Sequence, residues 1–208
     1  MGHPSDVAGP AGAAADVQPF VRQARLADAD AFATVQHRSW ADGATQHGLP
    51  EPPELDEMVR AWERAITVPP SPRHHSWVAI DRSAAGEVVH GAAATAPSSD
   101  PDLDAERCVE VVVLAVDPAA RGLGHGSRLV AAAMDAATVD GALEAVAWVG
   151  SDDDVTRRFL EAGGWVADGA FRTLTDDSAT RDSVGELRQV RLATSLRASD
   201  DDLEPSGR

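Results

Sequence analysis

The chain contains short apolar runs, which predict strands, and stretches with an apolar residue at every third or fourth position, which predict amphipathic helices. The clearest pair lies in the middle of the chain. Cys108–Val116 is an almost continuous apolar run, as expected for a buried strand. Asp117 and Pro118 mark its end. A helix is then predicted from the apolar stripe Leu129, Val130, Ala133, Met134 and Ala137.

The same patterns predict the remaining elements. Strands are expected at residues 20–25, 75–81, 87–94, 143–149, 166–174 and 184–193, and helices at 26–40, 54–66 and 152–162. Residues 41–53 and 98–105 are predicted loops. The resulting order is β-α-α-β-β-β-α-β-α-β-β, and the last two strands are expected to form an antiparallel pair. Segments 1–18 and 197–208 are predicted to be disordered tails, the second of them acidic.

A glycine-rich turn, Arg121-Gly-Leu-Gly-His-Gly126, joins the central strand to the helix. Without side chains the backbone can approach a ligand closely, and the first N–H groups of a helix attract anions. A Walker A loop is excluded because the chain has no lysine. The dinucleotide fingerprint fails because Ser127 stands where its third glycine belongs. A flexible crossover that binds nothing is the remaining alternative to a phosphate site.

The spacing Arg121-x-x-Gly124-x-Gly126, preceded by Leu114-x-Val116, resembles the GNAT superfamily of acyl-CoA-dependent N-acyltransferases. The likeness in element order covers residues 20–196. It implies an α/β (α+β) fold in which residues 19–196 form a single GNAT-like domain. A mixed central sheet of about six to seven strands would be flanked by about four helices.

The resemblance implies acetyl-CoA as cosubstrate, with its pyrophosphate on the loop amides and its pantetheine arm along the central strand. Arg121 is expected to support the phosphates, and Arg128, Arg157 and Arg158 are weaker candidates. Asp153 aligns with an Asn of the family's helix pattern, which suggests a role in cofactor binding. The alternative is that Asp153 only caps the helix. The expected cofactor-binding residues are Leu114, Ala115, Val116, Arg121, Gly122, Leu123, Gly124, His125, Gly126, Ser127 and Asp153.

Glu110 is the candidate catalytic base, because an attacking amine must lose a proton and family members often carry a glutamate at this position. Strict alternation would place it on the face of Val112 and Leu114. A structural carboxylate paired with an arginine is the alternative. The resemblance further implies a main-chain oxyanion donor near residues 114–116, at a bulge that splays this strand from residues 143–149.

The usual general acid is missing. Leu160 occupies the position of the family's tyrosine, and the chain has no tyrosine at all. Water or another group would have to protonate the leaving sulfur, and Ser151 is the nearest polar substitute. For the acceptor site the family's topology points to an aromatic and histidine set flanked by acids, which would suit a cationic amine. That set comprises His37, Trp40, His47, Trp62, His74, His75 and Trp77, with Glu51, Glu54 and Asp56 nearby.

The net charge and composition of the chain limit the classes of partner that we expect. A net charge of −16 argues against nucleic acid and anionic membranes as main partners. The alternative explanation of this charge is a contribution to solubility, or a bias in amino-acid composition, with no role in binding. No segment has the pattern of a membrane span or of a secretory signal. The single cysteine, Cys108, cannot form an internal disulfide. No cluster of histidines or cysteines has the spacing of metal ligands. We therefore expect a cytoplasmic protein without a metal, and the resemblance suggests a homodimer.

Three functions are compatible with these features. The first is an N-acetyltransferase that moves an acetyl group from acetyl-CoA to a primary amine of a small molecule or peptide, by direct attack in a ternary complex. The second is an acyl-CoA-binding module of the same fold with little or no turnover, which the missing tyrosine favours. A nucleotide-binding domain of another kind is disfavoured by the sequence of the glycine loop.

Overall fold

A mixed sheet of seven strands runs through the part of the chain that the computed structural model describes, residues 18–47, 51–175 and 186–197. All neighbouring strands are antiparallel except β4 and β5, which are parallel. In sheet order the strands are β1 (Gln18–Gln23), β2 (His75–Ser83), β3 (Gly86–Pro97), β4 (Cys108–Val116), β5 (Glu144–Gly150), β7 (Glu186–Ser195) and β6 (Val166–Thr175).

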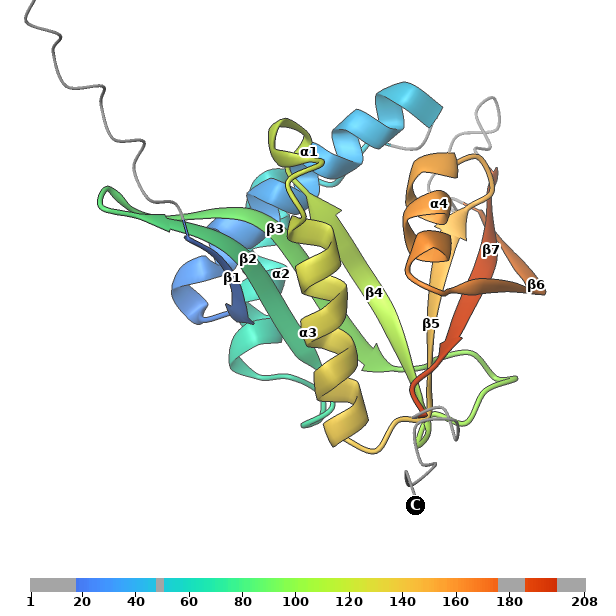
Figure 1. The fold of residues 1–208 in the computed structure, drawn as a ribbon. Coiled ribbons are helices and arrows are strands. Elements are labelled where there is room, and N and C mark those ends of the chain that lie inside the picture. Colours follow the sequence, from blue (N-terminus) through green and yellow to red (C-terminus); the bar gives the residue numbers. More distant parts are fainter. Residues whose placement is uncertain (1–17, 48–50, 176–185, 198–208) are drawn as a thin grey trace, which may run out of the picture.

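Four α-helices cover the two faces of the sheet within the described ranges (Figure 1). The helices α3 (His125–Val139) and α4 (Asp154–Ala162) lie on one face, and α1 (Ala29–His47) and α2 (Leu55–Thr67) lie on the other. Apolar side chains of β4, β5 and β7 pack with Leu160 and Trp165 beneath α4, and Phe32 of α1 packs on β2 and β3. None of the described helices has the length and apolar character needed to span a bilayer.

The predicted order and the antiparallel final pair are confirmed, and the β4 prediction matches its observed bounds. The first helix differs. A short 3-10 turn, Leu26–Asp28, precedes it, and α1 continues to His47, so the predicted loop at residues 41–47 is wrong. Gly43 disfavours helix there. Burial of Ala44 and an i,i+4 hydrogen bond from Gln46 Nε2 to Asp42 Oδ2 (2.8 Å) outweigh it.

Both predicted tails, 1–18 and 197–208, lie almost wholly outside the described residues, which begin at Gln18 and end at Arg197. The first two residues of the strand predicted at 184–193 also lie outside them. The predicted boundaries of the domain therefore stay predictions.

The parallel pairing of β4 with β5 covers only four residues of each strand. The ladder ends at Val111 opposite Ala147, and the strands then diverge toward their carboxyl ends (Figure 1). On its other side β4 remains paired with β3, where Thr95 opposes Val111 and Ala94 opposes Val113. Val112 is thus the extra residue of a β-bulge. The expected splay is confirmed, and its bulge lies just before the expected residues 114–116.

Close packing of α3 on the sheet generates a stability prediction at Gly91. A Cβ there would lie 2.9 Å from Leu129 Cδ1 and 3.3 Å from the Ala115 carbonyl oxygen. We expect Gly91→Ala to lower the free energy of unfolding in urea by about 1–3 kcal/mol through overpacking. Leu129→Ala should cost about 2–5 kcal/mol through a cavity. The double variant should lose less than the sum, because the new methyl fills part of that cavity. Additive losses would contradict the contact.

Candidate active site

The glycine loop lies at the carboxyl end of β4, where ligands bind in open α/β sheets. A short 3-10 turn, Pro118–Ala120, follows the strand and is capped by Asp117, whose Oδ1 accepts from the Ala119 N–H at 3.0 Å. Gly122 and Gly124 then adopt φ values of +78° and +82°, which residues with a side chain rarely adopt. The two glycines turn the chain directly into the N-terminus of α3.

The main-chain N–H groups of residues 122–127 donate to no acceptor among the described residues. They lie at the positive end of the α3 dipole, so they can bind an anion. Two arginines border the loop. Arg128 Nη1 donates to the Leu123 carbonyl at 3.1 Å, and Arg121 Nη1 pairs with Asp42 of α1 at 2.5 Å. Free amides, positive-φ glycines and two guanidinium groups fit a diphosphate.

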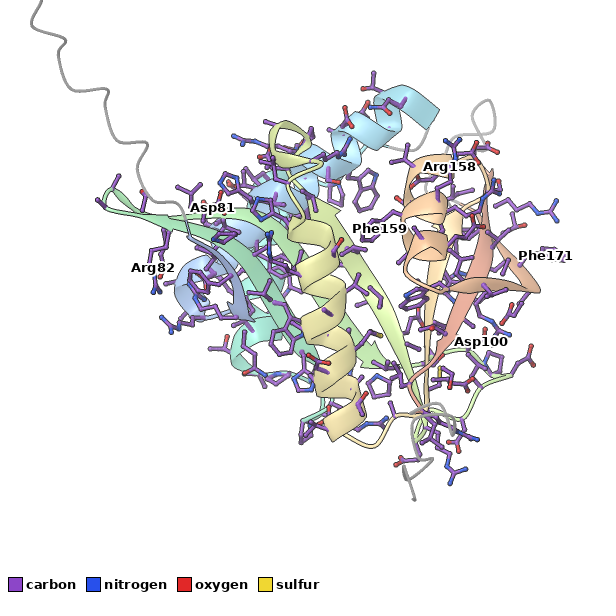
Figure 2. The ribbon with its side chains drawn as sticks, in the orientation of Figure 1. Asp81, Arg82, Asp100, Arg158, Phe159 and Phe171 are labelled. Atoms are coloured by element: carbon purple, nitrogen blue, oxygen red, sulfur yellow. The ribbon has the colours of Figure 1, made fainter. Side chains whose placement is uncertain are left out.

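An apolar pocket lies between α3 and α4 and begins at Ser127, the residue after the loop. Its lining includes Ser127 and Met134 of α3 and Phe159 of α4. Phe159 extends from α4 into the space in front of β4 (Figure 2), and its Cζ would lie 3.3 Å from a Cβ at Gly126. Beyond Val111, the edge of β4 that faces this space has no partner strand. Alternate main-chain groups of that edge are therefore open to a ligand.

The α4 side chain beside the loop is Phe159, whereas Leu160 is 2% exposed within the core. Neither carries a hydroxyl. Ser151, the polar substitute considered from sequence, donates its Oγ–H to Asp152 at 3.3 Å. Asp153 caps α4 by accepting from the Thr156 N–H at 2.9 Å, which confirms the capping interpretation.

The ring of His125 is turned away from the loop. It is 2% exposed, stacks on His90 with ring centroids 5.2 Å apart, and has its Nε2 3.9 Å from Asp81 Oδ1. Neither ring nitrogen has a hydrogen-bond partner among the described residues. Burial lowers the pKa of His125; Asp81 opposes this shift, and His90 and Arg128 add to it. His125 therefore offers its main-chain N–H to the loop while its side chain packs as a neutral ring.

Glu110 lies on the face of the sheet opposite α3 and α4. Strict alternation wrongly placed it on the face of Leu114, because the bulge at Val112 reverses the alternation. Val109 and Val111 pack in the core beneath α4, as does Leu114 beyond the bulge. Glu110 is buried, with 6% of its surface exposed. Its Oε2 accepts from the N–H and Oγ–H of Ser99, both at 3.4 Å.

Three side chains that the sequence analysis did not single out, Arg172, Trp148 and Arg191, form a chain of contacts that begins at Glu110. Arg172 of β6 places Nη1 4.0 Å from Glu110 Oε1 and stacks 4.4 Å from the ring centroid of Trp148. Arg191 of β7 joins Asp168 and Asp100, each at 2.6 Å. Their proximity depends on how β5, β6 and β7 pair, and the pairing of β5 with β7 joins strands that are distant in the sequence.

The aromatic and histidine set proposed for the acceptor comes together only in part: the rings of His75 and Trp77 lie with their centroids 5.9 Å apart. Trp62 donates its indole N–H to Gln36 and stacks on Phe32 between α1 and α2. Trp77 packs beneath α3 with Ala79 and Leu129. Of the other members, His37 and Trp40 lie on α1, which ends at His47. His74 contacts Ser71, and His75 contacts Asp140 as well as Trp77.

The other candidates are accounted for by local contacts. Arg157 and Arg158 both pair with Asp154 on the surface of α4. Cys108 is buried at the start of β4, and burial raises the pKa of its thiol to about 12. Over the described residues, no group of three or more histidine, cysteine, aspartate or glutamate side chains is placed to hold a metal ion.

The burial of His125 predicts a dependence of stability on pH. Its folded-state pKa is lowered, so the unfolded chain binds the proton more readily and stability falls as the pH drops below the unfolded value of about 6.5. His125→Leu should remove this contribution. Urea unfolding from pH 8 to pH 5 should show a smaller loss for the variant than for the wild type. Parallel profiles would mean that His125 is not held neutral.

The sequence model of the Acetyltransferase (GNAT) family matches residues 36–165, more than half of the 208-residue chain. No curated protein matches the sequence.

Among solved structures, an N-acetyltransferase from Staphylococcus aureus Mu50 is 19% identical with a TM-score of 0.61, covering 86% of this chain and 99% of that one. The yncA protein of Salmonella typhimurium, crystallised with its cofactor acetyl-CoA, is 19% identical with a TM-score of 0.60, covering 88% and 96%. The ribosomal-protein-S18-alanine N-acetyltransferase of Escherichia coli is 15% identical with a TM-score of 0.57, covering 89% and 99%. These likenesses show a shared fold, and the family match shows that the chain belongs to the GNAT family of acetyltransferases.

Proposed function

We propose that the protein transfers an acetyl group from acetyl-CoA to the primary amine of a small molecule or peptide, by direct attack in a ternary complex. One observation carries this proposal: the β4–β5 gap has free loop amides at its open end and a buried carboxylate, Glu110, beside its closed end. The acetyl-CoA bound to the yncA protein, which shares the fold, supports the choice of donor.

The residues present fit this donor. Amides of residues 122–127 would hold the diphosphate, with Arg121 and Arg128 adding charge. Leu114, Ala115 and Val116 would line the pantetheine arm, because their strand has no partner on the side of the gap. When bound, acetyl-CoA supplies a thioester, whose carbonyl carbon accepts the amine while the thiolate leaves.

Glu110 would act as the base. An alkylammonium group has a pKa near ~10.4, so it must lose a proton before it can attack. Within the described part of the chain, long contacts with Ser99 and Arg172 are all that hold the Glu110 carboxylate, which leaves it able to accept that proton directly or through water. Main-chain N–H groups at the bulge would stabilise the negative charge that develops on the acyl oxygen. The carbon–nitrogen bond forms as the carbon–sulfur bond breaks.

No tyrosine is needed to complete the reaction. The leaving thiol has a pKa near ~8.5, low enough for water to protonate the sulfur. The absence of a hydroxyl on Phe159 and Leu160 is nevertheless what favours the second candidate, an acyl-CoA-binding module without turnover. Release of free thiol from acetyl-CoA over a panel of amines separates the two functions, since only the transferase releases it faster with an amine than without.

The loop amides are tested by a matched pair of glycine substitutions. Gly124 and Gly141 have φ values of +82° and +85°, and only Gly124 belongs to the loop. Gly124→Ala and Gly141→Ala should each lose about 1–2 kcal/mol of folding free energy from the same backbone strain. In Gly124→Ala the new Cβ also lies 3.2 Å from Arg128 Nη1, whereas at Gly141 it meets no other atom within 4 Å. In titration calorimetry, the affinity for CoA should fall by about tenfold or more in Gly124→Ala and should not change in Gly141→Ala. Equal affinity in the two variants would remove the loop from the binding site.

The assignment of Glu110 is tested by Glu110→Gln, with Glu144→Gln at the start of β5 as the control. We expect kcat/KM at pH 7 to fall by about 10²-fold in Glu110→Gln and to stay near the wild-type value in the control. The deficit should shrink as the pH approaches the amine pKa of about 10, because free amine then needs no base. CoA affinity should not change. Unaltered turnover in Glu110→Gln would show that the base lies elsewhere.

A further inference from the structure

Glu110 and Arg172 carry opposite charges on the proposed acceptor side of the gap, but they are not hydrogen-bonded to each other. The closest approach of Glu110 and Arg172 is 4.0 Å, and no hydrogen bond joins them. Arg172 uses Nε to donate to Gln189 Oε1 at 2.7 Å, and no described residue accepts from its two Nη groups. Its side chain is 37% exposed. The Nη groups of this guanidinium are therefore available to donate hydrogen bonds to a ligand that reaches the surface.

The neighbouring Arg191 is a contrasting case, an arginine that is buried and paired with two carboxylates. It joins Asp168 and Asp100 at 2.6 Å each, and its side chain is 10% exposed. Burial acts to lower the pKa of Arg191, but the hydrogen bonds to Asp168 and Asp100 outweigh it and raise the pKa. Burial lowers the pKa of Arg172, and Glu110 and Asp100 offset this only in part. Arg191 therefore has two carboxylates at hydrogen-bond distance, whereas the Glu110 carboxylate beside Arg172 lies 4.0 Å away.

Trp148 connects this pair of charges to the gap. It follows Ala147, the last β5 residue paired with β4, so it stands across from the bulge at Val112. Its ring lies beneath the Arg172 guanidinium, and its buried indole N–H has no partner among the described residues. Glu110, Trp148 and Arg172 thus form one wall, at the point where an amine would meet the acyl group.

We propose that the acceptor is an α-amino acid, whose ammonium group faces Glu110 while its carboxylate binds Arg172. This rests on the proposed function. In an α-amino acid a single carbon separates the two charged groups, which suits a carboxylate and a guanidinium that lie 4.0 Å apart. A zwitterion also carries no net charge, so a chain of net charge −16 does not repel it. A diamine would place a second cation against Arg172.

The test compares amino acids with amines that lack the carboxylate. Acetyl transfer is measured as thiol release with L-leucine, L-phenylalanine and L-methionine, with their decarboxylated amines and with their amides. The wild type should favour each amino acid over its amine by about tenfold or more in kcat/KM, the range that a hydrogen bond to a charged group provides. An equal or reversed preference would overturn the proposal.

Arg172→Met should lower the ratio of kcat/KM for amino acid over amine toward one, mainly by raising KM for the amino acid, and Arg172→Lys should restore part of it. Arg188→Met is the matched control, since Arg188 is exposed, stacks on Phe171 and makes no contact with Glu110. It should keep the wild-type ratio. A ratio that survives in Arg172→Met overturns the assignment of the carboxylate to Arg172.

The failure of the amino-acid site differs from the failure of the proposed function. If amines and amino acids are acetylated alike, transfer stands and the site for the carboxylate falls. If CoA binds but no acceptor releases thiol, the transferase proposal falls. Calorimetric titration of L-leucine, L-phenylalanine and L-methionine into the CoA-bound wild type then decides the site by itself: heat with the amino acids and none with their amides supports it, and no heat with any of them overturns it.

Discussion

The end of the β4–β5 ladder at Val111 and Ala147 is the constraint on which the rest of the site depends. Strands of a continuous sheet would satisfy each other's main-chain groups and leave no space for a ligand. Here β4 keeps β3 as a partner and loses β5, so one edge stays structured while the other is open. The bulge at Val112 allows this divergence and also decides which side chains face each side of the gap.

Conformation and charge act together at the loop. Glycines at positive φ let the chain turn within two residues, which brings the free amides of the α3 N-terminus next to the open edge of β4. The ring beneath that N-terminus is a desolvated, neutral histidine, His125. A fixed cation there would oppose the helix dipole, whereas a neutral ring adds no charge of its own. Charge toward an anion therefore comes from Arg121 and Arg128 at the border of the loop.

The sequence predicted features that short-range rules govern. The strand, the glycine turn and the following helix are adjacent in the chain, and Asp153 caps its own helix. The side of Glu110 was mispredicted because residues 111–115 are all apolar, so no alternation marks the bulge. That bulge is defined by register with β3, a partner distant in sequence. The extension of α1 and the Arg172–Trp148 contact depend in the same way on tertiary packing.

The divergence of the two strands gives the gap a tapered form, since each residue beyond the last pair moves a further ~3.3 Å from the joint. A small rotation of the β5–β7 half about that joint would widen the mouth near Val116 far more than the apex near Val112. In the proposed binding mode, the apex rather than the mouth limits the thickness of the acyl group. Substitutions that change acyl-chain tolerance are to be sought at the backbone joint, Cys108–Val111 against Glu144–Ala147, and not in the glycine loop.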